Sequence, residues 1–427
     1  MIRQHHGVRG LAVPAVTLLA GVFGAVSAWR ALAPSWQVPL PSAANLPEER
    51  LQDFRDALYF PIKEFLAGGD PYDPAAMFAH WPVRQDFNLY QPYHLVLHLP
   101  FVLPGYRVGA VAFAVTSLVL LVLLSLLAAH AVRRYAPVPL ALGTTVIAAL
   151  LVTSQVGKAQ LYVGQVNPLI ALGAAGALLG RADHPRLAAV ALALAWLKPQ
   201  YGFPLAVLLF ARGSRRVAVT GTLLAAAASL PVVALLVVRT GGVGPFLDVI
   251  AANLSHATGT DYGAVDSVTA QRIDVAAVLF RTTGWVPPAV EAVVLAGVLV
   301  SGVLLTRRLD GLALPALADL LTCLAVVVCV VHQPGDVLIA VPAMAAVAGL
   351  WWRHRHERGW APAGLAVLAL AVPFAHLYVA DSAIGSLFGT RAAVTVDGVA
   401  VVVSWLLLVV FAVRLLRRRD ELVTVAG

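Results

Sequence analysis

The run LAAVALALAWLKPQYGFPLAVLLFA, residues 187–211, decides the fold class because it is apolar almost throughout and as long as a membrane span. Basic residues lie on both sides of it, Arg181 before and Arg212 after. Lys and Arg gather on the cytoplasmic side of membrane proteins, so a single crossing does not fit. Pro199 removes a backbone donor and breaks a helix. We therefore predict a hairpin of two short helices with Lys198 at its outer tip.

The same apolar character recurs along the whole chain. Of its 427 residues, 60% are hydrophobic and 12% are charged, whereas a soluble domain has about 25% charged residues. The net charge of +8 comes from basic clusters between the apolar runs. That pattern is typical of cytoplasmic loops and argues against nucleic acid as a partner. The sequence predicts an all-α, multi-pass membrane protein in one domain, residues 1–427.

The apolar runs predict about ten spans besides the hairpin. With this assignment every basic cluster falls on the cytoplasmic side, and so do both termini. Cys323 and Cys329 share one run and are expected to be packing residues, without a disulfide or a metal. The predicted spans are 11–29, 107–131, 138–152, 167–180, 217–238, 286–306, 312–331, 337–352, 361–379 and 392–413.

Two long polar segments, 34–106 and 239–285, fall on the external side. They collect acids, histidines and amides, whereas the cytoplasmic loops collect arginines, so chemistry is expected outside. Asp53 follows the first span closely, and a carboxylate at the membrane surface can take a proton from a sugar hydroxyl. Its alternative role is to cap the short helix that follows. No nucleotide-binding loop is present, which predicts an activated donor carried in the membrane.

Five short motifs follow one another in a recognisable order. They are DF (53–54), FLAGGDPYDP (65–74), YQP (90–92), GQVN (164–167) and LKPQ (197–200). In this order they resemble the motifs of family-87 glycosyltransferases of the GT-C superfamily, over a region that reaches from residue 53 to about residue 342.

The resemblance implies transfer of a sugar, often mannose or arabinofuranose, from a polyprenyl-phosphate donor. The acceptor would be a glycolipid or glycan of the cell envelope, on the external face of the plasma membrane. The resemblance also implies that Asp53 is the general base, and direct displacement at the anomeric carbon inverts its configuration. No cofactor or metal is expected. The chain has Gly335-Asp336 where members often have His-His, and Pro199-Gln200 after the lysine where mannosyltransferases often have Leu-Tyr.

Lys198 is the candidate contact for the donor phosphate, because an ionisable residue inside an apolar run is a functional hypothesis by default. The alternative is a lysine that reaches the membrane surface and anchors the hairpin. Gln200 beside it is a further candidate for substrate binding. Gln165 and Asn167 either bind sugar hydroxyls or cap the next helix.

Other polar residues have a structural alternative as well. Asp56, one helical turn after Asp53, is expected to support it in substrate binding. His332 lies in a turn that either lines the sugar pocket, together with Asp336, or is a plain external turn. His94 and His98 have zinc-ligand spacing, but no third ligand is evident.

Two other functions fit parts of the sequence. A transporter or lipid flippase would also have a broken helix and an intramembrane lysine. Its polar residues would lie at mid-membrane, whereas here they gather on one face. The third possibility is a catalytically inactive subunit of a cell-envelope complex.

Overall fold

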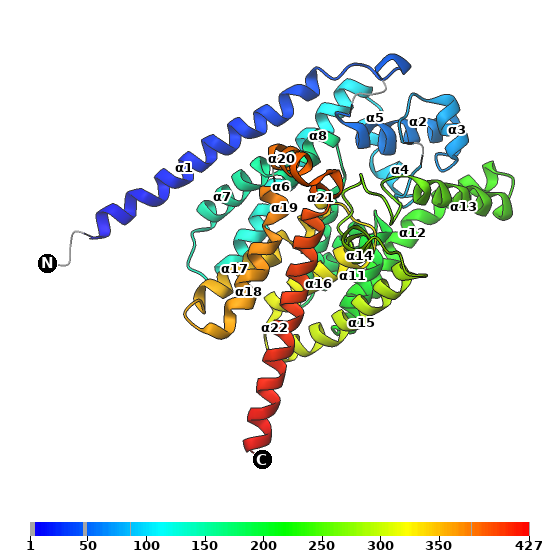
Figure 1. Ribbon diagram of the computed structural model, residues 1–427. Coiled ribbons are helices and arrows are strands. Elements are labelled where there is room, and N and C mark those ends of the chain that lie inside the picture. Colours follow the sequence, from blue (N-terminus) through cyan, green and yellow to red (C-terminus); the bar gives the residue numbers. More distant parts are fainter. Residues whose placement is uncertain (1–4, 46–48, 86, 377, 427) are drawn as a thin grey trace.

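The computed structural model describes residues 5–45, 49–85, 87–376 and 378–426. The regular secondary structure of this part of the chain is entirely helical, without a β-strand, which confirms the predicted all-α fold (Figure 1). By length and composition, seven helices among the described residues can cross a membrane, or eight if the bent pair of α7 and α8 forms one span. The fold is therefore that of a multi-pass membrane protein.

The N-terminal part contains one long helix and several short ones. α1 packs mainly on α7, and its free end projects from the body (Figure 1). The short helices α2–α5 gather at one side of the molecule, near α13 (Figure 1). The elements up to α8 are α1 (His5–Leu32), η1 (Ala33–Trp36), η2 (Ala43–Asn45), η3 (Phe54–Tyr59), α2 (Phe60–Ala67), α3 (Pro74–His80), α4 (His94–Leu97), α5 (Leu99–Val102), α6 (Tyr106–Arg133), α7 (Leu140–Thr153) and α8 (Gln155–Val163).

The remainder alternates between long helices and short connecting ones. α22, the last helix, projects from the body at its C-terminal end (Figure 1). These elements are α9 (Asn167–Gly180), α10 (Pro185–Ala195), α11 (Pro199–Ala211), α12 (Arg215–Arg239), α13 (Val243–Gly259), α14 (Val275–Thr283), α15 (Val290–Gly311), α16 (Pro315–Cys329), η4 (Pro334–Ala340), α17 (Val341–Arg353), η5 (Arg358–Trp360), α18 (Ala361–Leu370), α19 (Val372–Ala375), α20 (Tyr378–Phe388), α21 (Thr390–Ala393) and α22 (Val396–Ala426).

The predicted count of ten spans is not confirmed. Two of the expected spans form α9 and α16, which have 14 and 15 residues. At 1.5 Å per residue such helices reach only about 21–23 Å, less than the roughly 30 Å of a bilayer core. The expected span 138–152 continues past a 66° bend into α8 instead of ending in a loop.

The helix break predicted within residues 187–211 is present. α10 ends at Ala195 and α11 begins at Pro199. The backbone of the break is held by protein, because the N–H of Gln91 donates to the carbonyl of Leu197 at 2.9 Å. Irregular backbone inside a membrane requires such a partner. The bond also joins the YQP motif to the LKPQ motif.

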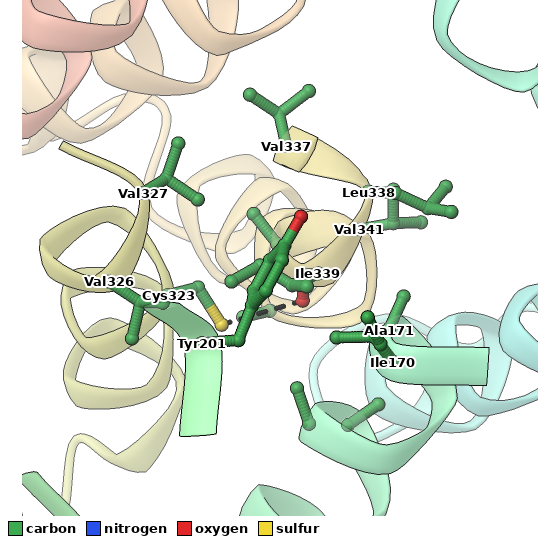
Figure 2. Packing of buried hydrophobic residues seen from close by; sticks show 14 of the residues in the cluster. Ile170, Ala171, Tyr201, Cys323, Val326, Val327, Val337, Leu338, Ile339 and Val341 are labelled. Carbon is green, nitrogen blue, oxygen red and sulfur yellow. Dashed lines mark hydrogen bonds between the residues drawn. The ribbon is translucent and has the colours of Figure 1, made fainter. Parts of the chain in front are cut away.

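α16 is the centre of the bundle. Every residue from Ala316 to Cys329 is buried, and the helix packs against α11, α15, α17 and α22. A helix that is apolar all round is expected at such a position. Figure 2 shows the same core near Tyr201 of α11, which lies among side chains of α9, α16 and η4. Both cysteines of α16 are buried and free.

Polar clusters lie at opposite ends of α9 and α16. At one end, Arg212 binds Asp310 through two nitrogens, at 2.7 and 2.8 Å, and Asp319 at 2.8 Å. Arg181 binds the same two carboxylates at 3.3 and 2.8 Å. The two arginines that flank the broken hairpin are therefore on the same side. At the other end, about 20 Å away by helix length, Asn167 begins α9 beside Lys198.

Candidate functional site

A cavity of about 860 Å³ opens at the Asn167 end of the bundle. Its walls come from the segment around Asp53, the break before α11, the turn before η4 and the elements after residue 370. Among the described residues, five of the seven predicted site residues line it: Asp53, Gln165, Lys198, Gln200 and His332. These residues are up to 279 positions apart in the chain, so the fold assembles the site.

The backbone around Asp53 is irregular. Leu51 adopts a left-handed conformation with φ of 56°, and its N–H donates to the Tyr162 carbonyl at 2.6 Å. η3, a π-helical turn, begins at Phe54 directly after Asp53. Single π turns and left-handed residues cost free energy and occur often at functional sites. Together they hold the Asp53 carboxyl at the cavity wall.

Gly164 explains why the GQVN motif begins with glycine. It ends α8 in a left-handed conformation with φ of 76°. A Cβ at this position would lie 2.9 Å from the Cβ of Phe54 and 3.1 Å from a methyl carbon of Leu51. Glycine alone allows the two segments to approach so closely. The next residue, Gln165, then reaches Asp53.

The Asp53 carboxyl is electrostatically tuned. Burial raises its pKa from 3.8 to about 6, against the opposing effects of the Lys198 ammonium and a side-chain hydrogen bond from Gln165. The carboxylates of Asp56 and Asp336 raise this pKa further. A carboxylate with such a pKa is ionised at neutral pH and is a stronger base than an exposed aspartate.

Lys198 is held from two sides. Its Nζ donates to Oδ1 of Asn167 at 2.9 Å and lies 5.6 Å from the centre of the Tyr90 ring. Among the described residues that line the cavity, it is the one lysine or arginine. It stands at the break before α11, so its ammonium is presented by rigid elements.

Asn167 connects the two charged groups. Its Oδ1 accepts from Lys198, while its Nδ2 donates to Gln165 at 2.6 Å and to Asp336 at 2.8 Å. It is buried and does not line the cavity. Asp336 also accepts from the backbone N–H of Gln333 at 2.9 Å. Asn167 is therefore a positioning residue for Lys198 and Gln165. Its burial leaves no side-chain polar atom unpaired, because both its Oδ1 and its Nδ2 have hydrogen-bond partners.

His332 lines the cavity and has one ring nitrogen without a hydrogen-bond partner among the described residues. Its Nδ1 lies 3.1 Å from the Val330 carbonyl, which can only accept, so Nδ1 carries the hydrogen. Nε2 is buried and has no hydrogen-bond partner among the described residues. Burial lowers the pKa of His332, which keeps the ring neutral and Nε2 available as an acceptor. The Tyr201 ring packs edge-on against it, with centroids 4.6 Å apart.

Asp56 does not line the cavity, unlike Asp53 and Asp336. It binds Arg55 at 2.6 and 3.1 Å and accepts from the backbone N–H groups of Arg84 and Gln85, each at 3.1 Å. Its oxygens are thus occupied by protein. Its direct effect on the site is the rise in the pKa of Asp53, and its main role is to fix the chain around residues 84–85.

The paired histidines form a structural unit. Both ring nitrogens of His94 are engaged, with the Gln91 carbonyl at 2.9 Å and the Asn88 amide at 3.2 Å. Burial lowers the pKa of His94 to about 3 and that of His98 to about 4, so both rings are neutral. No group of three or more His, Cys, Asp or Glu side chains in the described part of the chain could hold a metal.

The sequence did not reveal a further group of polar residues that lines the cavity. His376, Asp381 and Asp397 line the same cavity, and so does Asp266. His376 and Asp397 are 21 positions apart on different elements, so no local pattern signals the contact. Their position could be inferred only from the packing of α19 and α22.

Comparison with known proteins assigns the family. No curated protein and no solved structure matches the chain. The family model of glycosyltransferase family 87 matches residues 88–334, which is more than half of the chain. The matched region includes Lys198, Gln165, Asn167 and His332, whereas Asp53 lies before it. The chain, whose helical membrane bundle contains this matched region, therefore belongs to glycosyltransferase family 87.

Proposed function

We propose that this glycosyltransferase moves a sugar from a polyprenyl-phosphate donor to a glycan or glycolipid acceptor on the external face of the plasma membrane. The observation that carries the proposal is the pairing of Asp53 and Lys198 in one cavity at the end of a membrane bundle. A base and a cation are the two groups that such a transfer needs. The sugar is of the mannose or arabinofuranose class.

The proposed reaction is a direct displacement. The acceptor hydroxyl attacks the anomeric carbon, gives its proton to Asp53, and forms the new C–O bond as the bond to the phosphate oxygen breaks. The electron pair of the broken bond leaves with the polyprenyl phosphate, whose growing negative charge Lys198 stabilises. One displacement inverts the anomeric configuration. General base catalysis typically contributes about 10²–10⁴-fold, and stabilisation of the leaving phosphate contributes a comparable factor.

Several contacts support these roles. The raised pKa of Asp53 suits a base that works near neutral pH. Lys198 shares Asn167 with Gln165, which itself bonds to Asp53, so the cation and the base are held in one network. Gln200 and Nε2 of His332 offer polar atoms to the sugar hydroxyls.

The test is a transfer assay with purified protein in lipid nanodiscs. We expect transfer from a polyprenyl-phosphate sugar and none from the corresponding nucleotide sugar. Asp53→Asn should lower the rate by about 10²-fold or more and leave the protein folded, as judged by thermal unfolding. Use of the nucleotide sugar alone, or a normal rate in Asp53→Asn, would rule out this function. The flippase alternative predicts lipid movement without a new glycosidic bond.

A further inference from the structure

The cavity wall carries a second polar group, the His376 cluster, formed by His376, Asp381 and Asp397. His376 follows α19, Asp381 lies in α20, and Asp397 lies in the first turn of α22. All three line the cavity, and all three lie after the region that the family model matches. None of them is needed in the reaction described above.

His376 uses one ring nitrogen in a hydrogen bond, and its other ring nitrogen has only an ion-pair contact. Its Nδ1 lies 2.9 Å from Oδ1 of Asp397, and a carboxylate only accepts, so Nδ1 carries the hydrogen. Asp397 therefore fixes both the orientation and the tautomer of the ring. Nε2 is buried and has no hydrogen-bond partner among the described residues, and the whole side chain is only 5% exposed.

Asp381 places a second acceptor beside this nitrogen. Its Oδ1 lies 3.2 Å from Nε2 of His376, which is an ion-pair distance when the ring is protonated, but neither atom has a partner with hydrogen-bond geometry within the described chain. When the ring is neutral, the two atoms are neighbouring acceptors, and they suit two neighbouring hydroxyl donors such as the vicinal diol of a sugar. Buried polar atoms normally have partners, so the pair points to a ligand.

Charge distinguishes this wall from the Lys198 side. The His376 cluster has two carboxylates and one imidazole, so its net charge is negative even when the imidazole is protonated. A phosphate would be repelled here and attracted to Lys198. A neutral, hydroxyl-rich group has the opposite preference, because it can donate to carboxylate and imidazole without bringing negative charge.

We propose that the His376 cluster binds the acceptor sugar through two adjacent hydroxyls. The inference rests on the proposed function in one respect: the ligand is taken to be the acceptor of the transfer. Asp381 and Nε2 of His376 accept the hydroxyl hydrogens, and Asp397 holds the ring. The donor then enters along the Lys198 side, and the two substrates occupy different walls of one cavity.

The experiment measures binding and transfer separately. Saturation-transfer NMR with methyl α-mannoside and methyl α-arabinofuranoside reports binding to the purified protein in nanodiscs without any reaction. We expect at least one glycoside to bind the wild type. Asp381→Asn should weaken that binding about tenfold or more, because a charged hydrogen-bond acceptor is removed. In the transfer assay it should raise the acceptor KM about as much and leave the donor KM within about twofold.

Two further variants make the result specific. His376→Asn keeps an N–H near the position of Nδ1 and deletes Nε2, so it should weaken glycoside binding like Asp381→Asn. Asp266→Asn makes the same charge change at an exposed residue of the same cavity and should leave binding as in the wild type. Thermal unfolding checks that each variant is folded.

The outcomes separate the two proposals. Glycoside binding that depends on Asp381, without transfer from a polyprenyl-phosphate sugar, would support this subsite and sink the proposed function. Transfer by the wild type with unchanged acceptor KM in Asp381→Asn would overturn the subsite alone. Absence of glycoside binding by the wild type, or an equal loss in Asp266→Asn, would also overturn it.

Discussion

Burial and charge act against each other at Asp53, and the balance sets its pKa at about 6. A general base must be ionised, so activity is lost as the pH falls through this value. We predict that kcat/KM is constant above about pH 7 and declines tenfold per pH unit below about pH 6. A pH profile in nanodiscs checks this. A rate that stays constant down to pH 4.5 would exclude Asp53 as the base.

Lys198 is the second residue on which the account depends. Lys198→Ala should slow transfer about 10²-fold and weaken donor binding, because the negative charge on the phosphate grows as the sugar leaves. Lys198→Arg should keep part of the activity, since the charge remains but its shape changes. Steady-state kinetics with a polyprenyl-phosphate sugar distinguish the two variants. Equal donor KM and kcat in Lys198→Ala and wild type would contradict the role.

At the scale of elements, the contact between α8 and η3 fixes the base. Gly164→Ala would place a Cβ 2.9 Å from Phe54 in a backbone conformation that alanine rarely adopts. We predict a loss of stability of about 1–3 kcal/mol and a fall in kcat larger than that in Gly213→Ala. Gly213 is a matched control, because its φ is also positive and a Cβ there meets no atom within 4 Å. Similar effects of both substitutions would show that only backbone strain matters.

The elements also show what the sequence could predict. Pro199 and the flanking arginines were sufficient to predict the broken helix, because helix breaking and charge asymmetry are local signals. The lengths of α9 and α16 were not predictable from apolar runs. An apolar run does not show at which residue its helix begins or ends in the packed bundle. Asp56 was assigned to substrate binding, but its partners Arg84 and Gln85 lie 28 and 29 positions away, and only the folded chain brings them together.

At the scale of the whole molecule, the polar cavity and the Arg181–Arg212 cluster lie at opposite ends of the bundle. The charge asymmetry of the sequence predicted this separation. The acidic partners Asp310 and Asp319 were not anticipated, because pairing between distant helices leaves no pattern along the chain. The His376 cluster was not anticipated for the same reason, whereas the motifs included most of the predicted site residues that line the cavity.

This separation predicts a membrane orientation. Cysteines placed at Ser255 and His356, both exposed, should react differently with an impermeant maleimide in intact cells. Ser255→Cys should be labelled from outside, and His356→Cys, next to a basic cluster, only after permeabilisation. The background should lack Cys323 and Cys329. Labelling of His356→Cys in intact cells, with Ser255→Cys protected, would invert the orientation.

The position of a bound donor shows whether Lys198 binds the phosphate. A cryo-EM structure of the protein in nanodiscs with a polyprenyl phosphate would locate the phosphate. We predict that the phosphate lies inside the cavity, with an oxygen within about 4 Å of Lys198 Nζ, the distance of an ion pair. A phosphate bound at the Arg181–Arg212 end of the bundle, or outside the cavity, would contradict the account.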